Sequence, residues 1–159
     1  MRNKSCCFTG HRNVKNPAAL QEQLKAVITD LVENEGVTDF YCGGAIGWDT
    51  ISELAVVKVK FRHPHIRLHL VLPCCNEDQT EKWNQSDKNT FQLLLSKADT
   101  VEYLADRYYD GCMKKRNQRL VDMADFCVCY YNTGHAYSGT GQTVRFAEKK
   151  GIKIINLFS

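Results

Sequence analysis

Segments typical of β-strands alternate with segments typical of α-helices along this 159-residue chain. Short apolar runs are expected to form strands at residues 5–9, 40–42, 68–72, 100–104, 126–131 and 152–158. Between most of them, apolar residues recur at the helical spacing of three or four positions. Repeated β-α units of this length predict an α/β fold, in which a mostly parallel sheet lies between two layers of helices.

The first helix has the most recognisable ends. Asn16 before Pro17 is typical of an N-cap followed by a first helical residue, and Gly36 is typical of a helix end. An apolar stripe lies between them, formed by Leu20, Leu24, Val27, Ile28, Leu31 and Val32. No internal repeat, low-complexity segment or linker interrupts the chain, so a single domain over residues 1–159 is expected.

Composition narrows the classes of protein that fit. A formal net charge of +3 is too small to indicate nucleic-acid binding. No apolar run is long enough to span a membrane, and no signal peptide is expected because a strand is predicted from residue 5. The eight cysteines include no Cys-x-x-Cys pair, so neither a metal site nor a redox centre is expected. We predict reduced, mostly buried thiols in a cytoplasmic protein.

Three polar or glycine-rich turns each follow a predicted strand. Because the carboxyl ends of parallel strands share one edge of a sheet, these turns are expected to converge. Backbone N–H groups at such turns and at helix N-termini bind phosphates and carboxylates. The sequence therefore predicts an anion site, although each turn alone also fits a tight βα connection. Its candidate residues are Thr9, Gly10, His11 and Arg12 in the first turn, Gly43, Gly44, Gly47 and Asp49 in the second, and Ser138, Gly139 and Thr140 in the third.

The side chains of these turns leave alternatives open. Arg12, next to His11, fits a guanidinium that binds phosphate, or a solvated loop with a surface ion pair. Asp49 fits a ribose contact or a helix cap, and Trp48 fits stacking on a base or packing. Arg116 and Asn117 fit a ligand contact, but a solvated basic face also explains their cluster.

Several stretches together resemble one family over nearly the whole chain. They are Ser-Cys-Cys-Phe-Thr-Gly-His-Arg at 5–12, Gly-Gly-Ala-Ile-Gly-Trp-Asp at 43–49, Pro73-Cys74 followed by Gln79 and Trp83, and Arg116-Asn117 before Ala124-Asp125. This pattern resembles the YpsA-like proteins of the SLOG superfamily, which includes the LOG phosphoribohydrolases and the Smf/DprA proteins. The resemblance implies a Rossmann-like three-layer domain that binds a nucleotide or a nucleotide-derived ligand such as ADP-ribose, with no cofactor required.

One position separates this chain from the LOG enzymes. Those enzymes carry an arginine before the strand that corresponds to residues 126–131, and a Gly-Gly-x-Gly-Thr-x-x-Glu turn after it. Arg116 matches the arginine, but Arg145 occupies the glutamate position. Cleavage of an N-glycosidic bond needs an anion or a base near the developing oxocarbenium ion, so an arginine there supplies the wrong charge. Asp49 and Glu53 are the alternative carboxylates.

These expectations rank the candidate functions. Binding of a small nucleotide-type ligand in a sensor or regulatory role comes first. A nucleotide-processing hydrolase, similar to a phosphoribohydrolase, is the alternative. DprA-like nucleic-acid binding comes third because of the small net charge, and no membrane partner is expected. The catalytic residues, the identity of the ligand, homo-oligomer formation and the physiological partner stay open.

Overall fold

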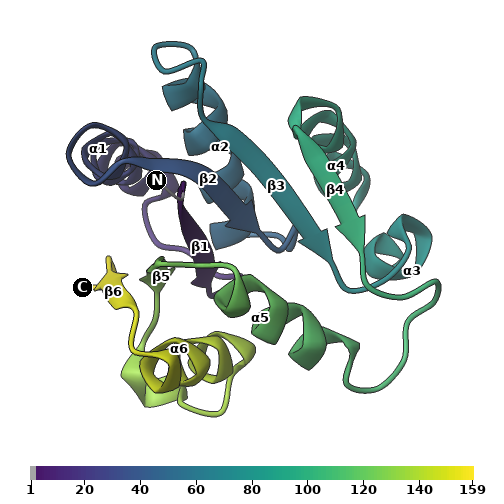
Figure 1. Cartoon of the computed structure of the whole chain (residues 1–159). Helices are drawn as coiled ribbons and strands as arrows, with labels where there is room; N and C mark the ends of the chain where they lie inside the picture. The colour runs from purple at the N-terminus through teal and green to yellow at the C-terminus, as the bar shows by residue number, and fades with distance from the viewer. Residues whose placement is uncertain (1–2) are drawn as a thin grey trace.

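The central feature of the fold is one parallel sheet. The computed structural model describes residues 3–159, and within them the strands pair in the order β4-β3-β2-β1-β5-β6 (Figure 1). All neighbouring strands run parallel, which confirms the predicted α/β Rossmann-like class. The strands are β1 (Lys4–Gly10), β2 (Val37–Cys42), β3 (Arg67–Leu72), β4 (Thr100–Tyr103), β5 (Phe126–Tyr130) and β6 (Lys153–Asn156).

Helices cover both faces of this sheet. On one face lie α1 (Pro17–Glu35), α2 (Trp48–Lys60) and α4 (Gln85–Lys97), which pack on β1–β3 through one apolar core. On the other face lie α5 (Cys112–Asp122) and α6 (Gly139–Lys150), packed through a second, smaller core. Two short elements that the sequence does not predict are α3 (Asn76–Thr80) and a 3₁₀ turn η1 (Thr133–His135).

Strand order reverses at β1, which pairs with β2 on one side and with β5 on the other. The chain leaves β1 toward α1 on one face, and it leaves β5 toward α6 on the opposite face (Figure 1). The two connections therefore diverge and open a crevice beyond the carboxyl ends of β1 and β5. In open α/β sheets this switch point is the usual place of a ligand site.

The predicted ends of α1 are confirmed in part. Pro17 begins α1, and Gly36 ends it with a φ of 73° while its N–H donates to the carbonyl of Leu31. Asn16 stands before Pro17, but its side chain makes no capping hydrogen bond because its own backbone is left-handed, with a φ of 50°.

The cysteines are unpaired, and all of them are buried except Cys75, in agreement with the expected burial.

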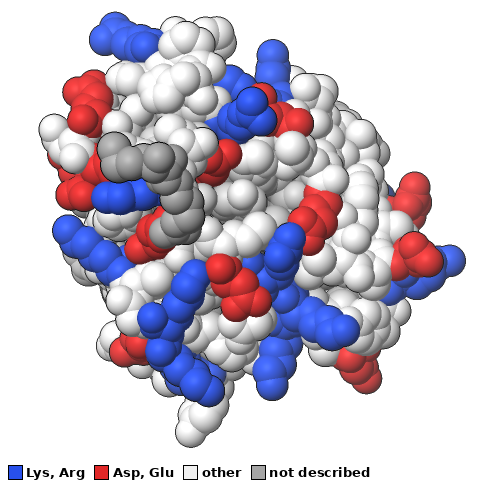
Figure 2. Space-filling view, viewed as in Figure 1, with Lys and Arg blue, Asp and Glu red and all other residues white. Residues whose placement is uncertain are grey.

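The surface carries charges of both signs. Figure 2 shows Lys and Arg side chains interspersed with Asp and Glu over the face that carries α5 and α6. Some of these charges form pairs, such as the Arg119 guanidinium with the Glu102 carboxylate at 3.0 Å. Within residues 3–159, no helix is both long enough and apolar enough to cross a membrane.

Candidate functional site

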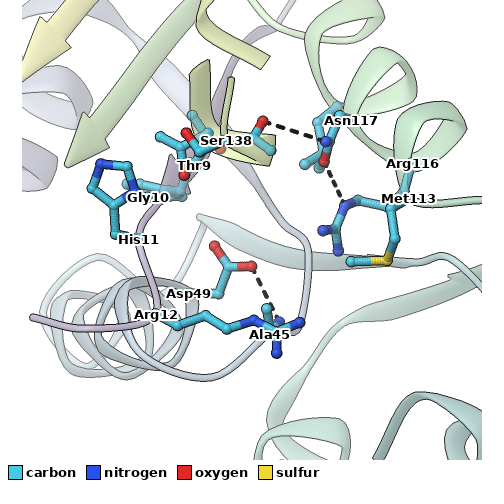
Figure 3. A pocket seen from close by; sticks show the side chains of 14 residues that line it. Thr9, Gly10, His11, Arg12, Ala45, Asp49, Met113, Arg116, Asn117 and Ser138 are labelled. Atoms are coloured by element: carbon cyan, nitrogen blue, oxygen red, sulfur yellow. Dashed lines mark hydrogen bonds between the residues drawn. The ribbon is translucent and has the colours of Figure 1, made fainter. Parts of the chain in front are cut away.

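A cavity of about 400 Å³ opens at the switch point between β1 and β5 (Figure 3). It receives residues from the end of β1, from the turn before α2, from α2 and α5, and from the start of α6. Four of these stretches are far apart in sequence, so the predicted convergence of the turns holds. The lining consists of Phe8, Thr9, Gly10, His11, Arg12, Ala45, Asp49, Met113, Arg116, Asn117, Leu120, Ser138, Gly139 and Thr140.

All of the predicted site residues line this cavity except Gly43, Gly44 and Gly47. A side chain on Gly43 would overlap the guanidinium of Arg116, and one on Gly47 would overlap the backbone of Arg12. Gly44 has a φ of 74° and lies against Leu72. These glycines therefore allow segments of the chain to approach each other closely. A side chain added at any of the three positions would meet other protein atoms.

Arg116 is the central cation of the cavity. Its side chain is buried, with the residue only 6 % exposed, although it belongs to a cluster of basic residues in the sequence. The Nη1 group donates to the Gly43 carbonyl at 2.5 Å, and Nε donates to Asn117 Oδ1 at 2.9 Å. Burial lowers the pKa of Arg116, and the negative charge of Asp49 opposes this shift. Its neighbours Lys114 and Lys115 are exposed and form a solvated basic face, but Arg116 does not belong to this face.

Asn117 connects α5 to the beginning of α6. Its Nδ2 donates to the Gly139 carbonyl at 3.5 Å and to Gln142 Oε1 at 3.3 Å. Ser138 caps α6, because its hydroxyl accepts the Gly141 N–H at 3.0 Å. The first helical turn at Gly139 and Thr140 faces the cavity, so the positive end of the α6 dipole points into it.

Asp49 and Glu53 form a pair of buried carboxyls one turn apart on α2. Asp49 Oδ2 accepts the Ala45 N–H at 3.1 Å, so the side chain holds the preceding turn and does not cap its own helix (Figure 3). Burial raises the pKa of Asp49, while Arg116 lowers it. Burial raises the pKa of Glu53 well above its usual range, and the charge of Asp49 adds to the effect. Within the described chain, Glu53 Oε1 has no hydrogen-bond partner.

His11 and Arg12 have different surroundings despite being neighbours. His11 Nε2 accepts the Asn132 N–H at 2.9 Å, and burial together with His135 lowers the pKa of His11. The neutral ring therefore positions the loop that follows β5. Arg12 is exposed, and its side chain makes no hydrogen bond or ion pair with any of residues 3–159. The surface ion pair that the sequence allowed is absent there, and the guanidinium is available to a ligand.

Two other residues lie away from the cavity. Trp48 is fully buried and stacks on Tyr130, with ring centroids 5.7 Å apart, so it packs and does not face a base. Arg145 is on the exposed side of α6, where it donates to the Ala136 carbonyl. Sequence reasoning missed Phe8, Ala45, Met113 and Leu120. The helical spacing of Met113, Arg116 and Leu120 was the signal that could have placed all three on one face.

Comparison with known proteins identifies relatives of this chain. The family model described as the YspA SLOG family, named YpsA, matches residues 6–157. The SPbeta prophage-derived protein YoqJ of Bacillus subtilis is 30% identical over 151 residues, which cover 86% of this chain and 85% of that protein. A UPF0398 protein of Halalkalibacterium halodurans is 28% identical over 116 residues, covering 72% of this chain and 58% of that protein. This chain therefore spans less than two thirds of that relative.

A solved structure supports the fold. The X-ray structure of TM1055, a structural-genomics target, matches with a TM-score of 0.57 at 15% sequence identity. The match covers 95% of this chain and 72% of that one. Together with the family match over residues 6–157, these likenesses identify the chain as a member of the YpsA family of SLOG proteins.

Proposed function

We propose that the cavity at the switch point binds a nucleotide or a nucleotide-derived ligand, such as ADP-ribose, in a sensor or regulatory role. The observation that carries the proposal is the cation arrangement. Buried Arg116 and exposed Arg12 line the same cavity as the N-terminus of α6. A guanidinium and helical N–H groups directed at one space favour a phosphate. Two of the five N–H groups of Arg116 bind protein acceptors, which leaves donors for a ligand.

Thermal shift and calorimetry with AMP and ADP-ribose test this proposal. A ligand that binds only the folded state raises the melting temperature. Arg116→Ala should weaken binding by about 1.5–3 kcal/mol, the usual contribution of a hydrogen bond to a charged group. Arg119→Ala is the matched control, because Arg119 lies on the same helix but pairs with Glu102 outside the cavity. Equal nucleotide affinity in folded Arg116→Ala and Arg119→Ala would place the ligand elsewhere.

A second candidate function is hydrolysis of a nucleotide or of its N-glycosidic bond. The observation in its favour is Asp49, a carboxyl that lines the cavity and whose pKa is raised by burial. Such a group suits general acid–base chemistry. Arg145 offers no carboxylate and lies outside the lining. Chromatography of AMP incubated with the protein decides between the functions, because a binding protein leaves AMP intact. A hydrolase releases adenine if it cleaves the N-glycosidic bond, or adenosine if it cleaves the phosphate ester, in a reaction that Asp49→Asn abolishes.

Nucleic-acid binding has no comparable support. Charges of both signs are interspersed on the face shown in Figure 2, and the net charge is small. A nucleic-acid binder would lose affinity steeply as salt concentration rises.

A further inference from the structure

A second, larger hollow adjoins the cavity at the switch point. Its volume is about 860 Å³, and its lining comes mainly from α3, the turn that follows α3, and the loop before α5. We call it the aromatic chamber. It is lined by Arg12, Ile46, Asp78, Gln79, Glu81, Lys82, Trp83, Asn84, Asp87 and Tyr108.

A narrow space of about 150 Å³ lies between the two hollows. It shares Ala45 and Met113 with the first cavity, and it shares Gln79, Trp83 and Tyr108 with the aromatic chamber. Arg12 lines all three spaces. The hollows therefore form one cleft along the carboxyl edge of the sheet, and the unpaired guanidinium of Arg12 stands where they meet.

Trp83 gives the chamber a fixed aromatic surface. Its ring packs edge-on against Phe91 in α4, with centroids 5.5 Å apart and planes at 89°. The side chain is only partly buried, in contrast to the fully buried Trp48. A ring that is held on one side and open on another suits stacking of a second flat ring.

Tyr108 supplies a second aromatic side chain, and hydrogen bonds hold the loop that carries it. It is 57% exposed, yet its backbone N–H donates to Asp78 Oδ2 at 2.8 Å. The neighbouring Arg107 binds the same carboxylate through Nε at 2.9 Å and Nη2 at 3.0 Å. These bonds, with Arg107 first, hold the pKa of Asp78 well below its usual range, so the carboxylate stays ionised. The loop that carries Tyr108 is thereby tied to α3.

Gln79 places an acceptor beside these rings. Its Nε2 donates to the Gly44 carbonyl at 3.1 Å, which fixes the orientation of the amide. Its Oε1 is buried and accepts no hydrogen bond from the described part of the chain. A buried acceptor without a donor is costly, so a ligand amino group at this position would remove a penalty.

The two parts of the cleft differ in the charges that line them. Asp78, Glu81 and Asp87 line the aromatic chamber together with Lys82 and Arg12. An anion therefore gains less there than in the first cavity, where Arg116 and the start of α6 face the space. An uncharged flat ring has no such disadvantage.

We propose that the aromatic chamber is a nucleobase subsite: the base lies against Trp83 and Tyr108 with its amino group toward Gln79, and the phosphate lies in the first cavity. This inference rests on the proposed nucleotide binding and names the part of the ligand that is recognised besides phosphate. It predicts an amino-substituted base such as adenine. A 6-oxo base such as hypoxanthine presents an oxygen to the Gln79 oxygen and binds more weakly.

Calorimetry with AMP and ribose 5-phosphate tests the subsite, because the second compound lacks the base. Trp83→Leu should weaken AMP binding roughly 5- to 150-fold, the range for loss of one base–aromatic stack, and should leave ribose 5-phosphate binding unchanged. Tyr108→Leu should act in the same direction, and the exposure of Tyr108 makes a folding defect from this change small. Phe61→Leu is the control, since Phe61 is exposed outside the cleft.

The amino-group preference has its own comparison. Wild-type protein should bind AMP more tightly than IMP, and Gln79→Met should remove most of this difference. Equal affinities of the wild-type protein for AMP and IMP would overturn the role of Gln79.

The remaining outcomes separate the subsite from the proposed function. If folded Trp83→Leu and Tyr108→Leu bind AMP normally while Arg116→Ala does not, the subsite is wrong and nucleotide binding stands. Parallel losses of AMP and ribose 5-phosphate binding would likewise overturn selective recognition of the base. If the wild-type protein binds neither compound, the subsite and the proposed function both fail.

Discussion

The buried carboxyl of Glu53 makes a sharp prediction about how stability depends on pH. Glu53 is 2% exposed, and one of its oxygens has no partner within residues 3–159. Burial raises its pKa well above the usual range, and the charge of Asp49 raises it further. The N–H of Gly44 and the positive charge of Arg116 oppose this shift without cancelling it. We predict that Glu53→Gln changes the pH dependence of the free energy of unfolding.

The sign follows from proton binding. In the unfolded chain a glutamate titrates near a pKa of about 4.3. Between that pKa and the raised native one, the folded protein keeps a proton that the unfolded chain releases. Stability therefore falls as pH rises through this window, by at most about 1.4 kcal/mol per pH unit for one proton. Below the window both states are protonated, and Glu53 contributes no pH dependence.

Urea unfolding between pH 5 and pH 8 measures the effect as a difference between wild type and Glu53→Gln. The lowered pKa of His11 gives a slope of opposite sign, but the two proteins share it, so it cancels in the difference. Glu148→Gln is the matched control, because Glu148 is exposed on α6. The variant at position 53 should gain stability relative to wild type as pH rises. A constant difference across this range would refute the argument that Glu53 retains its proton in the folded state.

Two further predictions concern the glycine turn and the thiols. Gly43→Ala should destabilise the fold by about 1–3 kcal/mol, the usual cost of overpacking, and should weaken AMP binding, because the new methyl group overlaps the Arg116 guanidinium. Denaturant unfolding and calorimetry measure the two effects, and a variant with normal stability and affinity would show that Arg116 does not need its present position. Thiol titration of the denatured, unreduced protein should find all eight cysteines free, and a stable disulfide would contradict the structure.

Local patterns were sufficient to predict the fold and most of the cavity. The strands are short apolar runs, and the turns after β1, before α2 and before α6 meet because parallel strands end at one edge. Composition alone does not predict that Arg116 is buried, because its neighbours in the sequence include exposed lysines. Its helical spacing from Met113 and Leu120 is the pattern that places it in the cavity. The number of charged residues in this segment would by itself predict an exposed Arg116.

Other features depend on contacts between distant segments. The glycines of the second turn signal a close approach, but the sequence does not say that Arg116, Leu72 and Arg12 are the groups that approach. The aromatic chamber escaped sequence analysis for a similar reason. The segment that carries Tyr108 has no periodic pattern, and its position depends on an ion pair between Arg107 and a carboxylate in α3.

The pairing of β1 with β5 also has a consequence for the growing chain. The Ser5 N–H donates to the carboxylate of Asp125, 120 residues later, and the cavity is completed only by Ser138, Gly139 and Thr140. During synthesis, β1 can pair with β2 before β5 has left the ribosome, and in such an intermediate the other edge of β1 stays unpaired. The proposed nucleotide ligand lacks its complete site on that intermediate, because Ser138, Gly139 and Thr140 have not yet been translated. We therefore expect the full stabilisation by the proposed ligand only after α6 has docked.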